Sequence, residues 1–204
     1  SFKNRFGTTD EIGAFRMTSE GMLEVPDLSG SLIENAIAEE GSVISATYEG
    51  SRPVFFEIQA LVAQANVGFA RRTAIGIGSN RLSMILAVLE KKAGITLLNH
   101  DVYANVVGGM KSDSTATDLA VALAIYSSYK NKACKKRIIA VGEVGLTGNL
   151  RAVPNVDRII QEAIRLGYEG IILPKKSAEA SKATGIRLYG ADNIVDAIRY
   201  FTAE

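Results

Sequence analysis

The stretch from Val106 to Tyr126 has the composition of a loop that can carry a reactive hydroxyl group. An apolar run ends at Gly108 and Gly109, which reach backbone angles that other residues avoid. The next polar residues are able to cap a helix: Ser112, Asp113, Ser114 and Thr115. The following residues are apolar at nearly every position, which predicts a buried helix. A polar loop at the N-terminus of such a helix can hold a nucleophile where the helix dipole stabilises negative charge.

This loop resembles the serine loop of the Lon protease proteolytic domain, in which a Lys-Asp-Gly-Pro-Ser-Ala-Gly run carries the nucleophile. With Asp113 matched to the aspartate of that run, Ala116 stands where the nucleophilic serine belongs. Alanine has no hydroxyl group, so it cannot form an acyl-enzyme. The lysine of the Lon dyad lies early in a helix after a Gly-Glu-Val segment, and the matching residue is Asp157. The resemblance implies a Lon-like domain that has lost both reactive groups.

Composition predicts a folded domain without metal or disulfide. The chain has 204 residues, 47% of them hydrophobic, and a formal net charge of +1, so any affinity for nucleic acid must come from a local patch. The single cysteine, Cys134, excludes an internal disulfide and suits a reducing cytoplasm. One cysteine and one histidine, His100, cannot form a His/Cys zinc site. We expect His100 to lie in a loop and to have a structural role.

The sequence also indicates which kinds of segment to expect. No apolar run approaches the roughly 20 residues of a membrane span, and no signal peptide is visible. The chain begins with Ser1 rather than methionine, so we expect a fragment or a processed chain. A G-x-x-x-x-G-K-[ST] phosphate loop is absent, so this chain by itself should not hydrolyse ATP.

The first residues carry a second resemblance. Lys3-Asn4-Arg5-Phe6-Gly7 is a short basic segment with one aromatic residue. The same pentapeptide is the signature of the RadA (Sms) family of bacterial DNA repair proteins, and the segments at 9–15, 71–76 and 142–148 are also similar to that family. In that family the pentapeptide lies between a RecA-like ATPase core and a Lon-like domain. The resemblance implies that residues 1–10 are the junction and that 11–204 form the Lon-like domain.

The family resemblance also implies partners and cofactors. RadA-type proteins are ring-forming, ATP-driven branch-migration motors that act with the RecA recombinase, and the Lon-like domain is expected to hold DNA and to help form a hexamer. ATP and Mg²⁺ are expected only for the ATPase core, and zinc only for an N-terminal finger, so none is expected in this chain. Lys3 and Arg5 are expected to reach nucleotide phosphate or DNA across a subunit boundary.

Hydrophobic periodicity predicts one mixed α/β (α+β) domain with two layers, of sheets and helices, as in the Lon proteolytic domain. Alternation predicts hairpins over 12–25, 43–62 and 143–153, and further strands over 73–77, 101–107, 138–141, 170–173 and 186–189. Helical spacing predicts helices over 32–38, 80–92, 157–166, 174–183 and 193–201, in addition to the helix that follows Thr115.

Six cations in predicted loops or at the starts of elements are the candidate DNA-binding residues. Loop arginines bind phosphate oxygens with a two-pronged fork, and such contacts are independent of sequence and sensitive to salt. The six are Arg52, Arg71, Arg72, Arg81, Lys111 and Arg151.

Two other functions remain open from the residues. One is a Ser/Lys peptidase with a shifted dyad, in which Ser112, Ser114 or Thr115 acts with Lys111 as base. Adjacent residues usually point apart, which disfavours Lys111 with Ser112. The other is a purely structural oligomerisation module that makes no direct contact with DNA.

Overall fold

The computed structural model describes residues 15–19, 21–25, 27–36, 38–65, 69–134 and 136–203. The pentapeptide Lys3–Gly7 lies outside these ranges. The main sheet is formed by β3 (Ser42–Glu49), β4 (Arg52–Gln64), β5 (Arg72–Ile75), β6 (His100–Val106), β7 (Ile138–Ala140), β10 (Gly170–Pro174) and β11 (Arg187–Ala191). Two hairpins pair β1 (Phe15–Thr18) with β2 (Gly21–Glu24) and β8 (Glu143–Val144) with β9 (Leu150–Arg151). The helices are α1 (Leu28–Ile33), α2 (Ser79–Ala93), α3 (Asp118–Lys130), α4 (Val156–Arg165), α5 (Lys175–Ala180) and α6 (Ile194–Thr202).

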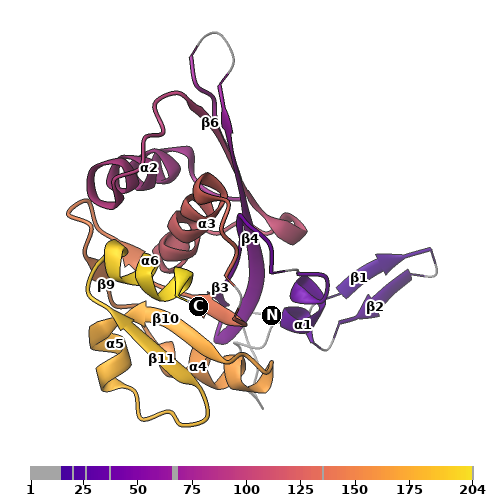
Figure 1. Ribbon diagram of the computed structural model, residues 1–204. Helices are drawn as coiled ribbons and strands as arrows, with labels where there is room; N and C mark the ends of the chain where they lie inside the picture. Colours follow the sequence, from indigo (N-terminus) through magenta and orange to yellow (C-terminus); the bar gives the residue numbers. More distant parts are fainter. Residues whose placement is uncertain are drawn as a thin grey trace.

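The seven-stranded sheet is mixed, with the order β11-β10-β7-β3-β4-β6-β5. β3 and β4 form the predicted antiparallel hairpin, and β6 continues the antiparallel pairing on the far half of β4. β7, β10 and β11 are parallel to one another and to β3, and β5 is parallel to β6. The predicted mixed α/β fold is confirmed (Figure 1).

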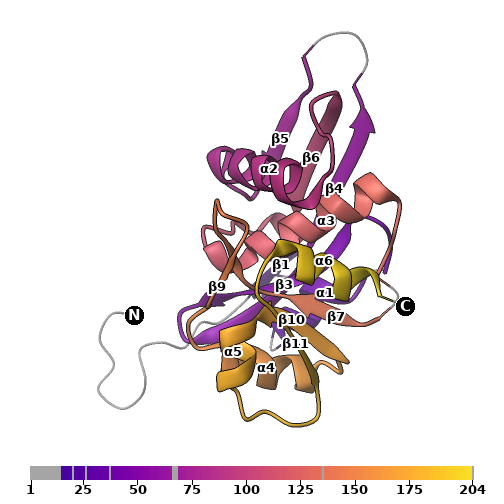
Figure 2. The same ribbon diagram turned by 60° about the vertical axis from the view of Figure 1, so that its left-hand side comes forward.

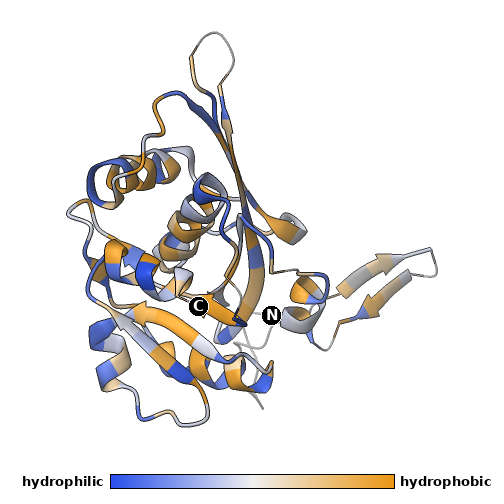
Figure 3. Ribbon diagram, viewed as in Figure 1, coloured by the Kyte–Doolittle hydropathy of each residue, from blue (hydrophilic) through white to orange (hydrophobic). Residues whose placement is uncertain are grey.

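Two hydrophobic clusters lie on opposite faces of this sheet. The larger cluster joins α2, α3 and α6 to β4, β6 and β10, and every residue of α3 from Asp118 to Ile125 is buried, as the apolar sequence predicts. The smaller cluster lies between α4 and the other face of β3, β4 and β10, and it includes Phe55, Ile159 and Ala116. Helices therefore cover both faces of this half of the sheet, which makes three layers there, whereas the sequence predicted two. The hydrophobic colour follows β4 and β10, and α5 is largely hydrophilic (Figure 3).

Local sequence signals explain where the helices end. Gly94, at φ 65°, ends α2 in the left-handed conformation, and Lys91 and Lys92 lie in its last turn, where cations favour the helix dipole. Asn131 ends α3 in the same way at φ 49°. The side chain of Asn193 accepts hydrogen bonds from the first free N–H groups of α6.

Two predicted boundaries were wrong for identifiable reasons. The helix predicted over 32–38 is α1, which begins earlier because the carboxylate of Asp27 accepts a hydrogen bond from Gly30 N–H. The guanidinium of Arg165 also donates to both carboxylate oxygens of Asp27, at 2.9 and 3.1 Å, which lowers the pKa of Asp27 and ties α1 to α4. His100 was predicted to lie in a loop, but it is the first residue of β6, and the centroids of its ring and that of Tyr129 lie 5.2 Å apart in an edge-to-face arrangement.

Two parts of the molecule extend away from this core. The β1–β2 hairpin projects to one side, with Phe15, Met17 and Met22 exposed (Figure 1). The far half of β4 forms an arm with β5 and β6 that extends beyond α2 and α3 (Figure 2). No helix in the described ranges is long and apolar enough to cross a membrane.

The buried hydroxyl of Ser127 is predicted to hold the C-terminal end of α3 against the start of β3. Its Oγ accepts from Gly41 N–H at 2.9 Å and donates to the carbonyl of Lys132 at 2.6 Å. We expect Ser127→Ala to destabilise the chain by about 1–3 kcal/mol, because the buried Gly41 N–H loses its acceptor and the carbonyl of Lys132 loses its donor. Urea unfolding measures this. The exposed Ser83→Ala is the control and should change stability by less than about 0.5 kcal/mol; equal effects of the two would refute the role of Ser127.

Candidate functional site

The loop that carries Ala116 is fixed to the core through its backbone. The 3-10 turns η1 (Val107–Gly109) and η2 (Thr115–Thr117) lie on either side of its polar part. Gly142 N–H donates to the carbonyl of Ala116 at 2.7 Å, and Leu119 N–H donates to the carbonyl of Gly142 at 3.0 Å. Ser112 N–H donates to the carbonyl of Gly76 at 2.7 Å. The loop is thus held from both sides.

An ion pair anchors the start of α3 below this loop. Arg81, in the first turn of α2, donates from Nε to Oδ1 of Asp118 at 2.7 Å and from Nη2 to Oδ2. Val144 N–H of β8 also donates to Asp118, at 3.1 Å. Burial raises the pKa of the Asp118 carboxyl, and the hydrogen bonds from Arg81 and Val144 oppose that rise. Asp118 therefore joins α2, α3 and β8 at one buried point.

Ala116 lines an open recess with a volume of about 470 Å³. Ala116 itself is 6% exposed. Tyr48 closes one side, with its hydroxyl donating to the carbonyl of Asn155 at 2.5 Å, and burial raises the pKa of that hydroxyl. The remaining lining residues are Thr47, Gly50, Ser51, Ser114, Val153, Pro154 and Arg158. The recess lies where the resemblance to Lon proteases implies a nucleophile, but the side chain at that position ends in a methyl group.

The α4 residue that lines this recess is Arg158, one position after the predicted Asp157. Arg158 Nη1 donates to the carbonyl of Ser51 at 2.9 Å. Asp157 does not line the recess. Its Oδ1 accepts a hydrogen bond from Ser181 Oγ at 2.7 Å. Sequence reasoning missed Arg158 because the match to the Lon lysine pointed to its neighbour. The helical start of α4 offered a signal, since successive residues there face different directions.

The hydroxyl residues weighed for a shifted peptidase dyad have other partners. Ser112 is buried, with its Oγ 2.8 Å from Oγ1 of Thr117. Ser114 Oγ accepts from Ala116 N–H, and Thr115 Oγ1 donates to Glu143 Oε2 at 3.0 Å. Among the described residues, the hydrogen bonds of these hydroxyls do not include Lys111. The loop hydroxyls thus cap and connect the backbone in this arrangement.

The structure separates the six predicted DNA-binding cations. Arg81 is paired with Asp118. Arg72 donates from its terminal nitrogens to the carbonyls of Arg71, His100 and Leu97, so that it fastens the base of the arm. Arg72 is level with Val62, near the far end of β4, whereas Arg52 is the first residue of that strand. At the usual rise per residue of a strand, Arg71 and Arg72 are therefore more than about 30 Å from Arg52. The six do not form one surface.

Three of the six adjoin the Ala116 recess along the chain. Arg52 follows Ser51, Lys111 is three residues before Ser114, and Arg151 is two residues before Val153. All three are exposed. Arg151 lies 3.6 Å from Glu143 in an exposed ion pair, which contributes little to stability. With Arg158, four cations belong to the chain segments around this recess.

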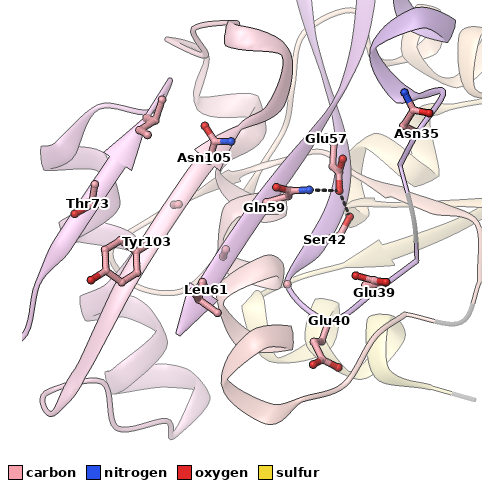
Figure 4. Close-up of a pocket in the computed structure, with 14 residues that line it drawn as sticks. Asn35, Glu39, Glu40, Ser42, Glu57, Gln59, Leu61, Thr73, Tyr103 and Asn105 are labelled. Atoms are coloured by element: carbon pink, nitrogen blue, oxygen red, sulfur yellow. Dashed lines mark hydrogen bonds between the residues drawn. The ribbon is translucent and has the colours of Figure 1, made fainter. Parts of the chain in front are cut away.

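A second recess, of about 430 Å³, has the opposite electrostatic character (Figure 4). It lies over the far half of β4, β5 and β6 and is bordered by the carboxylates of Glu39, Glu40 and Glu57. Glu57 is 6% exposed, and its Oε1 accepts from Ser42 Oγ at 2.6 Å and from Gln59 Nε2 at 3.0 Å. Carboxylates repel phosphate, so this face disfavours a nucleic acid. In the described part of the chain, no group of three or more His, Cys, Asp or Glu residues could hold a metal ion.

Comparison with known proteins places the chain in a family. Residues 65–177, more than half of the chain, match the family model described as subunit ChlI of Mg-chelatase, and the chain belongs to that family.

The chain is similar to proteins named DNA repair protein RadA. It is 42% identical over 199 residues to the protein of Bacillus subtilis, covering 97% of this chain and 43% of the relative. It is 48% identical over 187 residues to the protein of Streptococcus pneumoniae, covering 91% of this chain and 43% of the relative. The chain spans less than half of these relatives. The similarity confirms the prediction from the sequence that this chain is the C-terminal region of a RadA-type DNA repair protein.

The Arg81–Asp118 pair is predicted to matter for stability. Arg81→Ala leaves the carboxylate of Asp118, 2% exposed, without its counter-ion, and we expect a decrease of about 3–5 kcal/mol in the free energy of unfolding. Denaturant unfolding measures it. Lys111→Ala removes an exposed cation of the same region and should cost less than about 0.5 kcal/mol. If Arg81→Ala were as stable as Lys111→Ala, Asp118 would not depend on this partner.

Proposed function

We propose that this chain is the non-proteolytic, DNA-binding domain of a RadA-type DNA repair protein. The observation that supports this most is the recess in which Ala116 occupies the nucleophile position while the surrounding segments carry four cations. A site without a nucleophilic hydroxyl group at that position does not form an acyl-enzyme there. Arg158 lines this recess, and the adjoining chain segments carry three more exposed cations, an arrangement that suits the phosphates of a nucleic-acid backbone.

The proposed contacts are made by Arg52, Lys111, Arg151 and Arg158. Arg158 has one terminal nitrogen on the carbonyl of Ser51, and its other nitrogens have no hydrogen-bond partner among the described residues. A guanidinium held in this way is oriented, and its free edge can bind a phosphate oxygen. Arg52 adjoins the same turn. These cations would hold DNA without reading its sequence.

Other properties of the whole protein are part of the same proposal. The boundary between a junction over 1–10 and a Lon-like domain over 11–204 belongs to it, as do a DNA-dependent ATPase elsewhere in the longer protein and a cytoplasmic location. We further propose that the domain supports a hexameric ring, and that this ring promotes branch migration with the RecA recombinase. The likeness to DNA repair proteins named RadA supports these steps.

Charge removal around the recess tests the DNA-binding proposal. We expect the combined variant Arg52→Ala, Arg151→Ala, Arg158→Ala to bind a short duplex about tenfold or more weakly than the parent chain. The slope of log K against log salt concentration should also become shallower by about 0.9 for each phosphate that the variant no longer neutralises. Fluorescence anisotropy across a salt titration measures both.

Lys132→Ala is the matched control, because Lys132 is an exposed cation just beyond the opposite end of α3. It should bind as the parent does. Unchanged affinity and salt slope in the combined variant would exclude this recess as the DNA-binding surface. Denaturant unfolding of the combined variant checks that weaker binding does not come from unfolding.

A purely structural oligomerisation module is the second candidate. The exposed apolar residues of the β1–β2 hairpin favour it, since a two-stranded hairpin is marginal in water without a partner. This candidate predicts that the double variant Met17→Lys, Met22→Lys forms an assembly of lower mass than the parent chain in light scattering. It also predicts that the parent chain does not bind DNA. A monomeric parent chain would exclude it.

The pentapeptide remains a prediction for the longer protein. We expect Lys3→Ala there to lower DNA-stimulated ATP hydrolysis and branch migration, because a cation supplied to a phosphate across a subunit boundary stabilises the charge of the reaction. ATP turnover with and without DNA measures this. Normal rates in both assays would remove Lys3 from that role.

A further inference from the structure

Hydrogen bonds join three described chain segments near the far ends of β4, β5 and β6, and we call these joined segments the platform. Ala65 N–H, just after β4, donates to the carbonyl of Asn99 at 2.9 Å. Arg71 N–H donates to Oδ1 of Asp101 at 2.7 Å, and the carbonyl of Arg71 accepts from Val102 N–H at 2.9 Å. These bonds tie the described parts of β4, β5 and β6 together where the arm extends beyond the helices that cover the core (Figure 2).

Arg72 strengthens the same platform from below. Its Nη2 donates to the carbonyl of Leu97 at 2.7 Å, and its Nη1 donates to the carbonyls of Arg71 and His100. A guanidinium that binds three backbone carbonyls locks the strand and the neighbouring loop together. The position of Arg71 on this platform is therefore well defined.

Two exposed side chains, Phe69 and Arg71, adjoin this platform along the chain. The side chain of Phe69 is completely exposed, at 102% of its reference area. No other large hydrophobic residue in the described part of the chain has so high an exposed fraction. Arg71 is exposed two residues later, and its guanidinium has no hydrogen bond or ion pair within that part. A phenylalanine that buries no area contributes nothing to the core, and its ring face is open to a ligand.

The chemistry of this pair matches a single-stranded nucleic acid. An aromatic ring offers a face on which an unpaired base stacks, and an arginine fork binds the neighbouring phosphate. A duplex hides the faces of its bases in its own stack, so the ring gains little from it. The recess on the sheet below carries the carboxylates of Glu39, Glu40 and Glu57, which would keep a polyanion at the end of the arm (Figure 4).

We propose that Phe69 and Arg71 form a binding site for single-stranded DNA, in which Phe69 stacks on a base and Arg71 binds an adjacent phosphate. The inference rests on the proposed DNA-binding function, and it deepens that function by adding a second site at the opposite end of β4 from Arg52. Duplex bound at the Ala116 recess and a displaced strand bound at the arm would let one chain hold a branched DNA.

The absence of tryptophan makes a direct test possible, because Phe69→Trp introduces the single tryptophan of the chain. We expect a single-stranded oligonucleotide to quench its fluorescence by stacking. An abasic oligonucleotide of the same length and charge should bind without quenching. Equal emission with both oligonucleotides would overturn the proposed stacking.

Affinities of two alanine variants separate the two roles. Phe69→Ala should weaken binding of the base-containing strand about tenfold, within the range for removing one stacked base, and leave the abasic strand unchanged. Arg71→Ala should weaken both strands alike, because it removes a cation that binds phosphate. Phe69→Tyr keeps an aromatic face and should restore binding, and Leu98→Ala is the control for an exposed apolar side chain at the same end, 73% exposed.

The outcomes distinguish this inference from the proposed function. If the parent chain binds DNA and Phe69→Ala binds every probe equally well, the arm site is refuted while the recess proposal stands. If Phe69→Ala lowers the mass of the assembly in light scattering and leaves binding of the single strand unchanged, the arm is an interface between proteins and the inference is refuted. If the parent chain binds no DNA, both proposals fail.

Discussion

The buried carboxylate of Asp118 is the point on which the arrangement of the site depends. It lies 2% exposed at the start of α3, where it accepts from the guanidinium of Arg81 and from Val144 N–H. A charge in such a place is tolerated only when it is paired and hydrogen-bonded. Arg81 belongs to α2 and Val144 to β8, so satisfying the carboxylate of Asp118 sets the positions of these two elements relative to α3. The loop that carries Ala116 is then positioned directly before α3.

Main-chain hydrogen bonds position that loop independently of its side chains. The backbone bonds between Ala116, Gly142 and Leu119 do not depend on the side chain at position 116. A methyl group in place of a hydroxyl therefore leaves the recess intact. Arg158 contributes a cation to the wall of this recess. The geometry of the loop is thus held by main-chain hydrogen bonds, whichever side chain stands at position 116.

Charge divides the surface of the molecule into regions of different use. Cations accompany the segments around the Ala116 recess, carboxylates border the recess over the far half of the sheet, and the end of the arm combines an aromatic ring with an arginine. A net charge of +1 conceals this division, because 23 basic and 22 acidic residues nearly cancel. Local arrangement, and not the average, decides where a polyanion can approach.

The sequence by itself determined the elements and the family. Periodicity located α2 and the β3–β4 hairpin, because each buries a face whose residues recur at a fixed spacing, and a nearly unbroken apolar run located α3. The loop with Ala116 and the pentapeptide Lys3–Gly7 supported the assignment to the family.

Only the tertiary structure decided which cations are available to bind a ligand. Nothing in the local sequence separates Arg72 and Arg81 from Arg52 and Arg71. In the fold, the guanidinium of Arg72 binds the adjacent carbonyl of Arg71 and two carbonyls 25 and 28 residues away along the chain. The guanidinium of Arg81 binds a carboxylate 37 residues away. The structure likewise decided that Arg158, and not Asp157, lines the recess. Such interactions depend on packing between distant segments, which local spacing does not encode.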